Sequence, residues 1–95
     1  MKAKSSGLKT NSAAICDKPC FYLGTTVVGD NTKDLILTIF DNASTGAGTE
    51  VDYFQCTDEN YNVCHIMRFP VWCANGIYGK MDVASEGDFI VWYAR

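Results

Sequence analysis

The chain lacks features that several large classes of protein need. Its 95 residues contain two prolines and one histidine. No apolar run approaches the ~20 residues that a membrane helix requires. Lys2 and Lys4 stand near the start, but the polar stretch after them is not the apolar core of a secretory signal. We therefore expect a soluble protein that is made in a cytoplasm and has no membrane contact.

A single histidine also offers little for catalysis. A serine or cysteine nucleophile needs a base within hydrogen-bond reach, and a third group must orient that base. His65 directly follows Cys64, and neighbours on a strand point to opposite faces. We expect His65 to be paired within the sheet. The sequence also has no nucleophile motif and no phosphate-binding loop, so we expect no enzyme activity, no cofactor and no small-molecule substrate.

Charge is distributed unevenly along the chain. The first 18 residues carry four lysines and one aspartate, whereas the rest carries four basic and ten acidic residues. An acidic body argues against nucleic-acid binding. Residues 1–14 are polar and predict an extended N-terminal arm that is flexible or ordered only by a partner. Its candidate contact residues are Lys2, Lys4, Leu8 and Lys9, and residues 15–95 form the expected single domain.

Short β-branched and aromatic runs, separated by turn residues, dominate that domain. The strands expected are Phe21–Val28, Leu35–Asp41, Glu50–Thr57, Tyr61–Phe69, Val71–Ala74, Ile77–Val83 and Asp88–Ala94. Their spacing predicts an all-β fold, a small antiparallel β-sandwich or jelly-roll-like barrel of six to eight short strands.

Glycine and proline refine this expectation. Gly24 inside a strand indicates a bulge or a close backbone approach, and Pro70 interrupts a strand. The turn cluster at residues 29–34 predicts a hairpin between its flanking strands. Asn75-Gly76 predicts a second hairpin, because type I′ turns need positive φ at both central residues.

Five cysteines cannot all form disulfides within one chain, and without an export signal we expect them to be reduced. Cys16 and Cys20 have the spacing of a metal-binding pair, and Cys56 and Cys64 would face one another across a turn. Only the first pair is tightly spaced. Buried free thiols are therefore favoured over a disulfide or a metal site, and these four cysteines are the candidate ligands if a metal is bound.

The sequence has more aromatic residues than a small core needs. A surplus on one face would form a protein interface or a sugar platform, and Trp72 and Trp92 are the candidates. Acids also gather near two turns, and we expect them to be solvated there. They are Asp30, Asp34, Asp41, Glu50 and Asp52.

Several strand and turn signatures together resemble a family of small all-β virion proteins from tailed bacteriophages. They are Leu35, Thr38–Ser44, Gly48-Thr49, Phe69–Val71, Asn75–Tyr78, Gly87 and Val91–Tyr93. The resemblance covers residues 21–93. It implies a virion structural protein on the capsid exterior, either a decoration (cement) protein or a head or tail accessory protein. A decoration protein would bind the major capsid protein and stabilise the head, and the resemblance suggests a homotrimer whose N-terminal arm lies on the capsid.

Two alternatives remain open on the sequence. One is a carbohydrate-binding β-sandwich module that uses exposed aromatics and loop acids for virion or host-surface recognition. The other is a small cysteine-dependent metal-binding protein.

Overall fold

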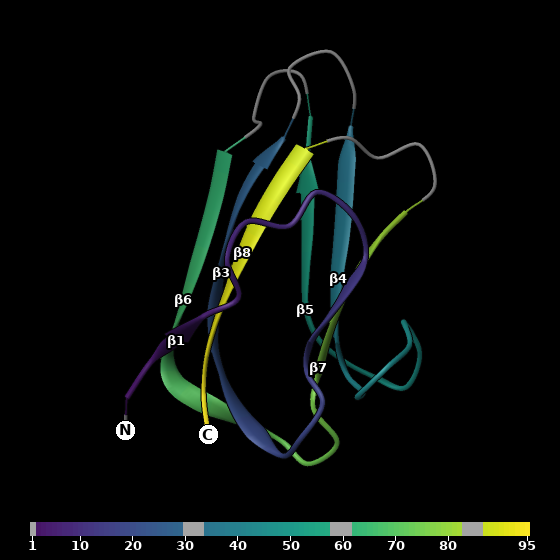
Figure 1. The fold of residues 1–95 in the computed structure, drawn as a ribbon. Coiled ribbons are helices and arrows are strands. Elements are labelled where there is room, and N and C mark those ends of the chain that lie inside the picture. The colour runs from purple at the N-terminus through teal and green to yellow at the C-terminus, as the bar shows by residue number, and fades with distance from the viewer. Residues whose placement is uncertain (1, 30–33, 58–61, 83–86) are drawn as a thin grey trace.

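The computed structural model describes residues 2–29, 34–57, 62–82 and 87–95, and the elements in them are strands (Figure 1). The strands are β1 (Lys4–Ser5), β2 (Ala13–Cys16), β3 (Cys20–Gly29), β4 (Leu35–Asp41), β5 (Thr49–Cys56), β6 (Asn62–Cys73), β7 (Ile77–Met81) and β8 (Gly87–Ala94). Within these ranges, no helix is long and apolar enough to cross a membrane.

Two four-stranded antiparallel sheets pack face to face, which confirms the predicted β-sandwich. Sheet A has the order β1-β8-β3-β6, and sheet B has the order β2-β7-β4-β5. Successive strands alternate between the sheets except for β4 and β5, which pair across the small-residue loop 42–48. This is the strand order of an eight-stranded jelly roll.

The two predicted hairpins are wrong. The turn cluster after β3 leads to β4, which belongs to the other sheet, although its residues 30–33 lie outside the described ranges. Asn75 and Gly76 likewise connect β6 in sheet A to β7 in sheet B. Gly76 has φ 131°, and a Cβ there would meet the Cys16 carbonyl oxygen. The residues of a connection do not specify which sheet the next strand joins.

The core lies between the sheets and follows the two-residue period of the strands. In β4, Leu35, Leu37 and Ile39 are fully buried, and their neighbours point outward. The largest fully buried apolar side chains are Tyr22, Val27, Leu35, Leu37, Ile39, Phe54, Ile77, Phe89 and Val91. Each aliphatic or Phe side chain among them stabilises the fold by roughly 1.5–3 kcal/mol.

Strand β6 bends where it crosses β3. Tyr22 pairs with Val71 and Gly24 pairs with Ile66, so the residues 67–70 stand opposite Leu23 alone. Pro70 lies in this stretch, where its missing N–H leaves no ladder bond unmade. The sequence predicted that Pro70 would divide the strand, but β6 continues through it as a bulge. The predicted close approach at Gly24 is confirmed, because a Cβ there would collide with the His65 carbonyl oxygen.

The N-terminal segment belongs to the sandwich, which corrects the expectation of a free arm at residues 1–14. Strand β1 pairs with β8, Lys9 bridges Phe89, and β2 pairs with β7. The Ser12 hydroxyl donates to the Met81 carbonyl and accepts from the Met81 N–H. The Ser6 hydroxyl accepts from the Val91 N–H, and the Ser6 backbone N–H donates to the Val91 carbonyl. In Figure 1 the purple segment after β1 crosses from one sheet to the other. Backbone and hydroxyl groups hold this segment in place. Because the segment has few apolar residues, the hydrophobic pattern of the sequence did not reveal its position.

Candidate functional site

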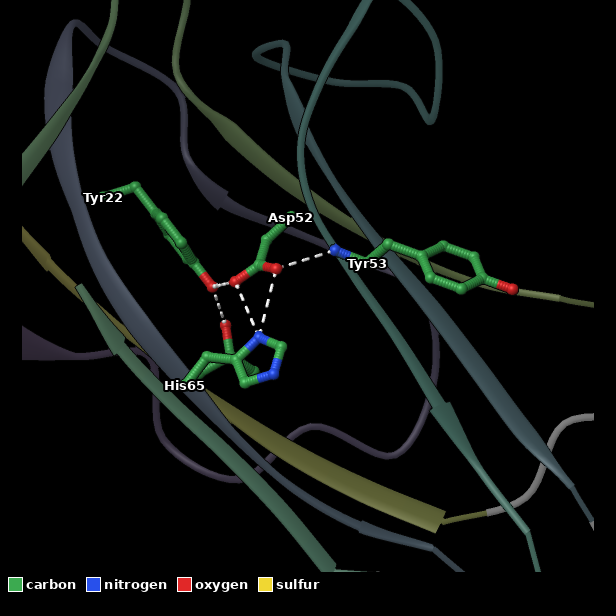
Figure 2. A network of polar contacts seen from close by, with 5 residues as sticks. Tyr22, Asp52, Tyr53 and His65 are labelled. Atoms are coloured by element: carbon green, nitrogen blue, oxygen red, sulfur yellow. Dashed lines mark hydrogen bonds and ion pairs between the residues drawn. The ribbon is translucent and has the colours of Figure 1, made fainter.

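A polar network lies on the opposite flank, where the edge strands β5 and β6 approach one another from different sheets. Its centre is Asp52 on the inward face of β5, opposite the fully buried Ile39 of β4. The Tyr22 hydroxyl donates to Asp52 Oδ2 at 2.8 Å, and the Tyr53 backbone N–H donates to Asp52 Oδ1 at 2.8 Å (Figure 2). Figure 2 also shows the Tyr53 ring pointing away from the network. Asp52 therefore bonds to β3 while its own backbone remains in sheet B.

Tyr22 and Thr25 form the buried end of the network. Both are fully buried, and the Tyr22 hydroxyl lies 2.7 Å from Thr25 Oγ1. Burial raises the pKa of Tyr22 well above its ordinary value, and the Asp52 carboxylate raises it further, although the Thr25 hydrogen bond acts in the opposite sense. Tyr22 is therefore a neutral phenol whose one proton goes to Asp52, so Thr25 must donate to Tyr22.

His65 forms the exposed end of the network. Its Nδ1 lies 3.2 Å from Asp52 Oδ1 and 3.4 Å from Oδ2, and its ring packs on Phe54 at 4.4 Å between centroids. The side chain of His65 is 43% exposed, and that of Asp52 is 11% exposed. His65 thus pairs across the two sheets, whereas the sequence predicted pairing within one. Asp52 is a nearly buried acceptor and not the solvated turn acid that we expected.

This network joins side chains from three strands of both sheets. An aspartate that holds Nδ1 of a histidine is the orienting half of a catalytic triad, and the other half is a nucleophile beside Nε2. The adjacent thiol of Cys64 is exposed on the other face of β6, as the sequence predicted, and lies 3.5 Å from Thr26 Oγ1. The network thus connects β3, β5 and β6 and closes this flank.

Three cysteines gather where β2, β3 and β6 meet. Cys20 pairs with Cys73 in the strand register, and the Cys16 thiol donates to the Lys18 carbonyl oxygen at 3.4 Å. Burial raises the pKa of Cys20 to about 12, with Cys16 adding to the shift, and raises the pKa of Cys73 to about 11. The thiols of Cys20 and Cys73 are therefore protonated at neutral pH. The sequence spacing predicted that Cys16 and Cys20 lie close together. It did not indicate that Cys73 lies beside them, because Cys73 is distant in the sequence.

The remaining candidate metal ligands are separated. Cys56 is buried on the inward face of β5, whereas Cys64 is exposed on the outer face of β6, so the expected approach of these two across the turn is wrong. All five thiols are free, and no three ligand side chains within the described ranges are arranged to hold a metal ion.

The outer surface of sheet A carries many apolar side chains. Its residues follow from the register, because directly paired residues share a face: Phe21, Leu23, Thr26 and Val28 on β3, Cys64, Ile66 and Trp72 on β6, and Ile90 and Trp92 on β8. We call this surface the apolar face. Ile66 is 66% exposed, Phe69 75% and Trp72 54%, and the Trp72 ring packs against Phe21 at 4.9 Å between centroids.

The predicted contact residues therefore divide into two groups. Trp72 and Trp92 lie on the apolar face, one on each side of β3. The candidates of the N-terminal segment lie along or beyond the β8 edge, where Leu8 is exposed and Lys9 bridges Phe89. They are Lys2, Lys4, Leu8 and Lys9. The sequence analysis did not single out Ile66 or Phe69 as exposed residues. Strand alternation had nevertheless placed Ile66 on the other face of the strand from His65.

Comparison with known proteins adds no relative to this description. No family model, no curated protein and no solved structure matches the chain.

Proposed function

We propose that this chain is a non-enzymatic structural protein of a bacteriophage virion, a capsid decoration protein that binds the major capsid protein lattice and stabilises the head. The observation that carries the interaction role is the apolar face of sheet A. The resemblance of residues 21–93 to small virion proteins supports the biological setting, and a compact jelly roll suits it because this fold is common in capsid components.

The apolar face has the composition of a protein interface. Exposed aromatic residues are enriched at the centres of such interfaces, and charged residues are depleted there. Trp72 is an exposed aromatic residue of this face, and Ile66 lies on the same strand. A sugar platform would place hydrogen-bonding side chains around its aromatic ring, whereas Trp72 has Phe21 beside it. This setting favours a protein partner over a carbohydrate.

The polar groups of the domain support a non-enzymatic role. Asp52 accepts hydrogen bonds from Tyr22 and Tyr53 and contacts His65, so these contacts hold the two sheets together. A catalytic pair would instead direct its histidine at a nucleophile.

Co-sedimentation with purified phage heads tests the proposal. The chain would be labelled at its N-terminal amine and mixed with heads that lack it. We expect saturable binding at a fixed number of copies per head, together with heads that survive higher temperature. Heads already saturated with unlabelled protein are the control and should take up no label. A chain that stays in the supernatant at every concentration would contradict the proposal.

A further inference from the structure

We infer that Cys20 and Cys73 are the two halves of a latent disulfide, a site at which a small-molecule disulfide such as oxidised glutathione crosslinks β3 to β6. The inference goes beyond the proposed function, because it concerns covalent chemistry within one chain and no capsid takes part. All five thiols are free in the structure, which is therefore the reduced form. A cytoplasm keeps such a pair reduced, whereas an oxidising compartment allows the bond to form.

The strand register brings the two cysteines together. Cys20 is the first residue of β3 and pairs directly with Cys73, the last residue of β6. Directly paired residues of an antiparallel sheet have Cα atoms about 4.5 or 5.5 Å apart, depending on the hydrogen-bond pattern. Both values lie within the Cα separation of disulfides, roughly 4.4–6.8 Å. The two side chains also share the inward face, because directly paired residues point the same way and both are fully buried.

The positions of the other thiols select this pair. Cys16 lies close enough to Cys20 to raise its pKa, but it belongs to β2 of sheet B, so no strand register fixes the distance between them. Cys56 and Cys64 each pair in the register with a residue that is not cysteine. Cys20 and Cys73 are thus the cysteines that the fold places directly opposite one another.

The bond holds a part of β6 that has few backbone pairs of its own. The bulge at residues 67–70 separates the end of β6 from the rest of its pairing with β3. Beyond the bulge, three consecutive pairs remain, from Tyr22–Val71 to Cys20–Cys73, and the chain then leaves for sheet B. A crosslink at the last of these pairs fixes this end of β6 against β3, together with the adjoining part of the apolar face.

The reaction is two successive thiol–disulfide exchanges. One cysteine thiolate attacks the small disulfide, which forms a mixed disulfide and releases one small thiol. The other cysteine attacks the protein sulfur of that mixed disulfide, so the bond between Cys20 and Cys73 forms and a second small thiol leaves. Two electrons and two protons pass from the cysteine pair to the small disulfide. Burial raises the pKa of Cys20 to about 12 and that of Cys73 to about 11, so the folded pair reacts slowly and exchange requires this end of β6 to open.

Refolding in a glutathione buffer that contains both the oxidised and the reduced form tests the inference. Refolding from urea exposes both sulfurs to the buffer, so burial cannot prevent the pair from reacting. Cys64→Ser is the parent chain, because it removes the exposed thiol that would link one chain to another. We expect this chain to lose the mass of two hydrogen atoms and to retain two thiols that can be alkylated after unfolding. A refolded chain that retains all four thiols would overturn the inference.

Peptide mapping locates the bond. Asp17 separates Cys16 from Cys20, so trypsin combined with a protease that cleaves before aspartate places the two cysteines on different peptides. We expect a linked product of residues 17–29 and 69–80, which contain Cys20 and Cys73. A bond from Cys16 to either of them would exclude the pairing that the register implies.

Urea unfolding of the reduced and crosslinked forms measures the effect on stability. We expect the crosslink to lower the equilibrium constant of unfolding at least about 100-fold, because it closes a long loop in the unfolded chain. Reduction of the crosslinked form should abolish the difference. In the same parent chain, Cys73→Ala should unfold identically before and after the glutathione treatment. Cys56→Ala removes an equally buried thiol and should still show the full difference. A crosslinked form no more stable than the reduced form would contradict the inference.

Discussion

Replacing Asp52 by alanine should destabilise the fold far more than replacing any exposed acid. The carboxylate joins three strands from both sheets, because it accepts from Tyr22 of β3 and Tyr53 of β5 and contacts His65 of β6. Alanine deprives the fully buried Tyr22 hydroxyl of its acceptor, and the phenol cannot reach water instead. Thr25 remains beside Tyr22 but already donates to it.

The expected magnitude follows from the separate contacts. A hydrogen bond to a charged acceptor contributes about 1.5–3 kcal/mol, and a buried donor left without a partner costs a similar amount. The His65 contact adds at most about 1 kcal/mol, because that side chain is 43% exposed and solvent screens the interaction. The variant no longer has the desolvation cost of burying a carboxylate, and this gain offsets part of the lost stability. We therefore expect Asp52→Ala to lower the free energy of unfolding by about 2–4 kcal/mol.

Urea unfolding at pH 7, followed by tryptophan fluorescence, measures this change. The midpoint should fall while the slope with denaturant stays constant, because the exposed area on unfolding is unchanged. Glu50→Ala is the matched control: it removes the same charge from an exposed position on the same strand and should cost less than about 0.5 kcal/mol. Equal effects of the two substitutions would refute a structural role for Asp52. A double-mutant cycle with Tyr22→Phe should give a coupling energy of at least about 1 kcal/mol.

Three further changes test other parts of the fold. Gly24→Ala should cost more than about 3 kcal/mol, because Gly24 has φ 149° and a Cβ would collide with the His65 carbonyl; a midpoint within experimental error of wild type would contradict this. Ser12→Ala should speed amide exchange at Met81 at least tenfold, since the hydroxyl accepts that N–H, and unchanged protection would exclude this tether. Stability should fall above about pH 9, because the folded pKa values of Cys20 (about 12) and Cys73 (about 11) exceed those of unfolded thiols; a urea midpoint that is flat from pH 8 to 11 would disprove it.

Local patterns predicted the strands well and their partners poorly. The run Leu35–Asp41 was expected with the bounds that β4 has, because the two-residue alternation of burial is visible within one strand. Strand pairing depends on contacts between distant segments. Asn75-Gly76 does reverse the chain, but the strand that follows enters the other sheet. The same reasoning fails for the N-terminal segment, whose place depends on serine hydroxyls and backbone bonds that leave no hydrophobic pattern.

The polar network was missed for a different reason. Asp52 was one of five acids near turns, and its charge was taken as a sign of exposure. Alternation contained the missing signal, because Asp52 shares a face of β5 with Phe54 and Cys56, and both of these are buried. An acid on an apolar face needs partners. Those partners, Tyr22 and His65, come from strands that are distant in sequence, so only the folded structure could identify them.

The edges and the outer face of sheet A are protected to different degrees, and this difference bears on how the chain associates. Exposed strand edges recruit other chains, and short strands, bulges and prolines prevent this. Strand β1 at one edge of sheet A is two residues long, and β6 at the other edge carries the bulge of residues 67–70 with Pro70 within it. The outer face has no comparable protection, since Ile66 and Trp72 stand exposed on one strand. Pairing along an edge is therefore disfavoured while packing through the face is left open, so a partner of this domain should meet the side chains of sheet A and not its backbone.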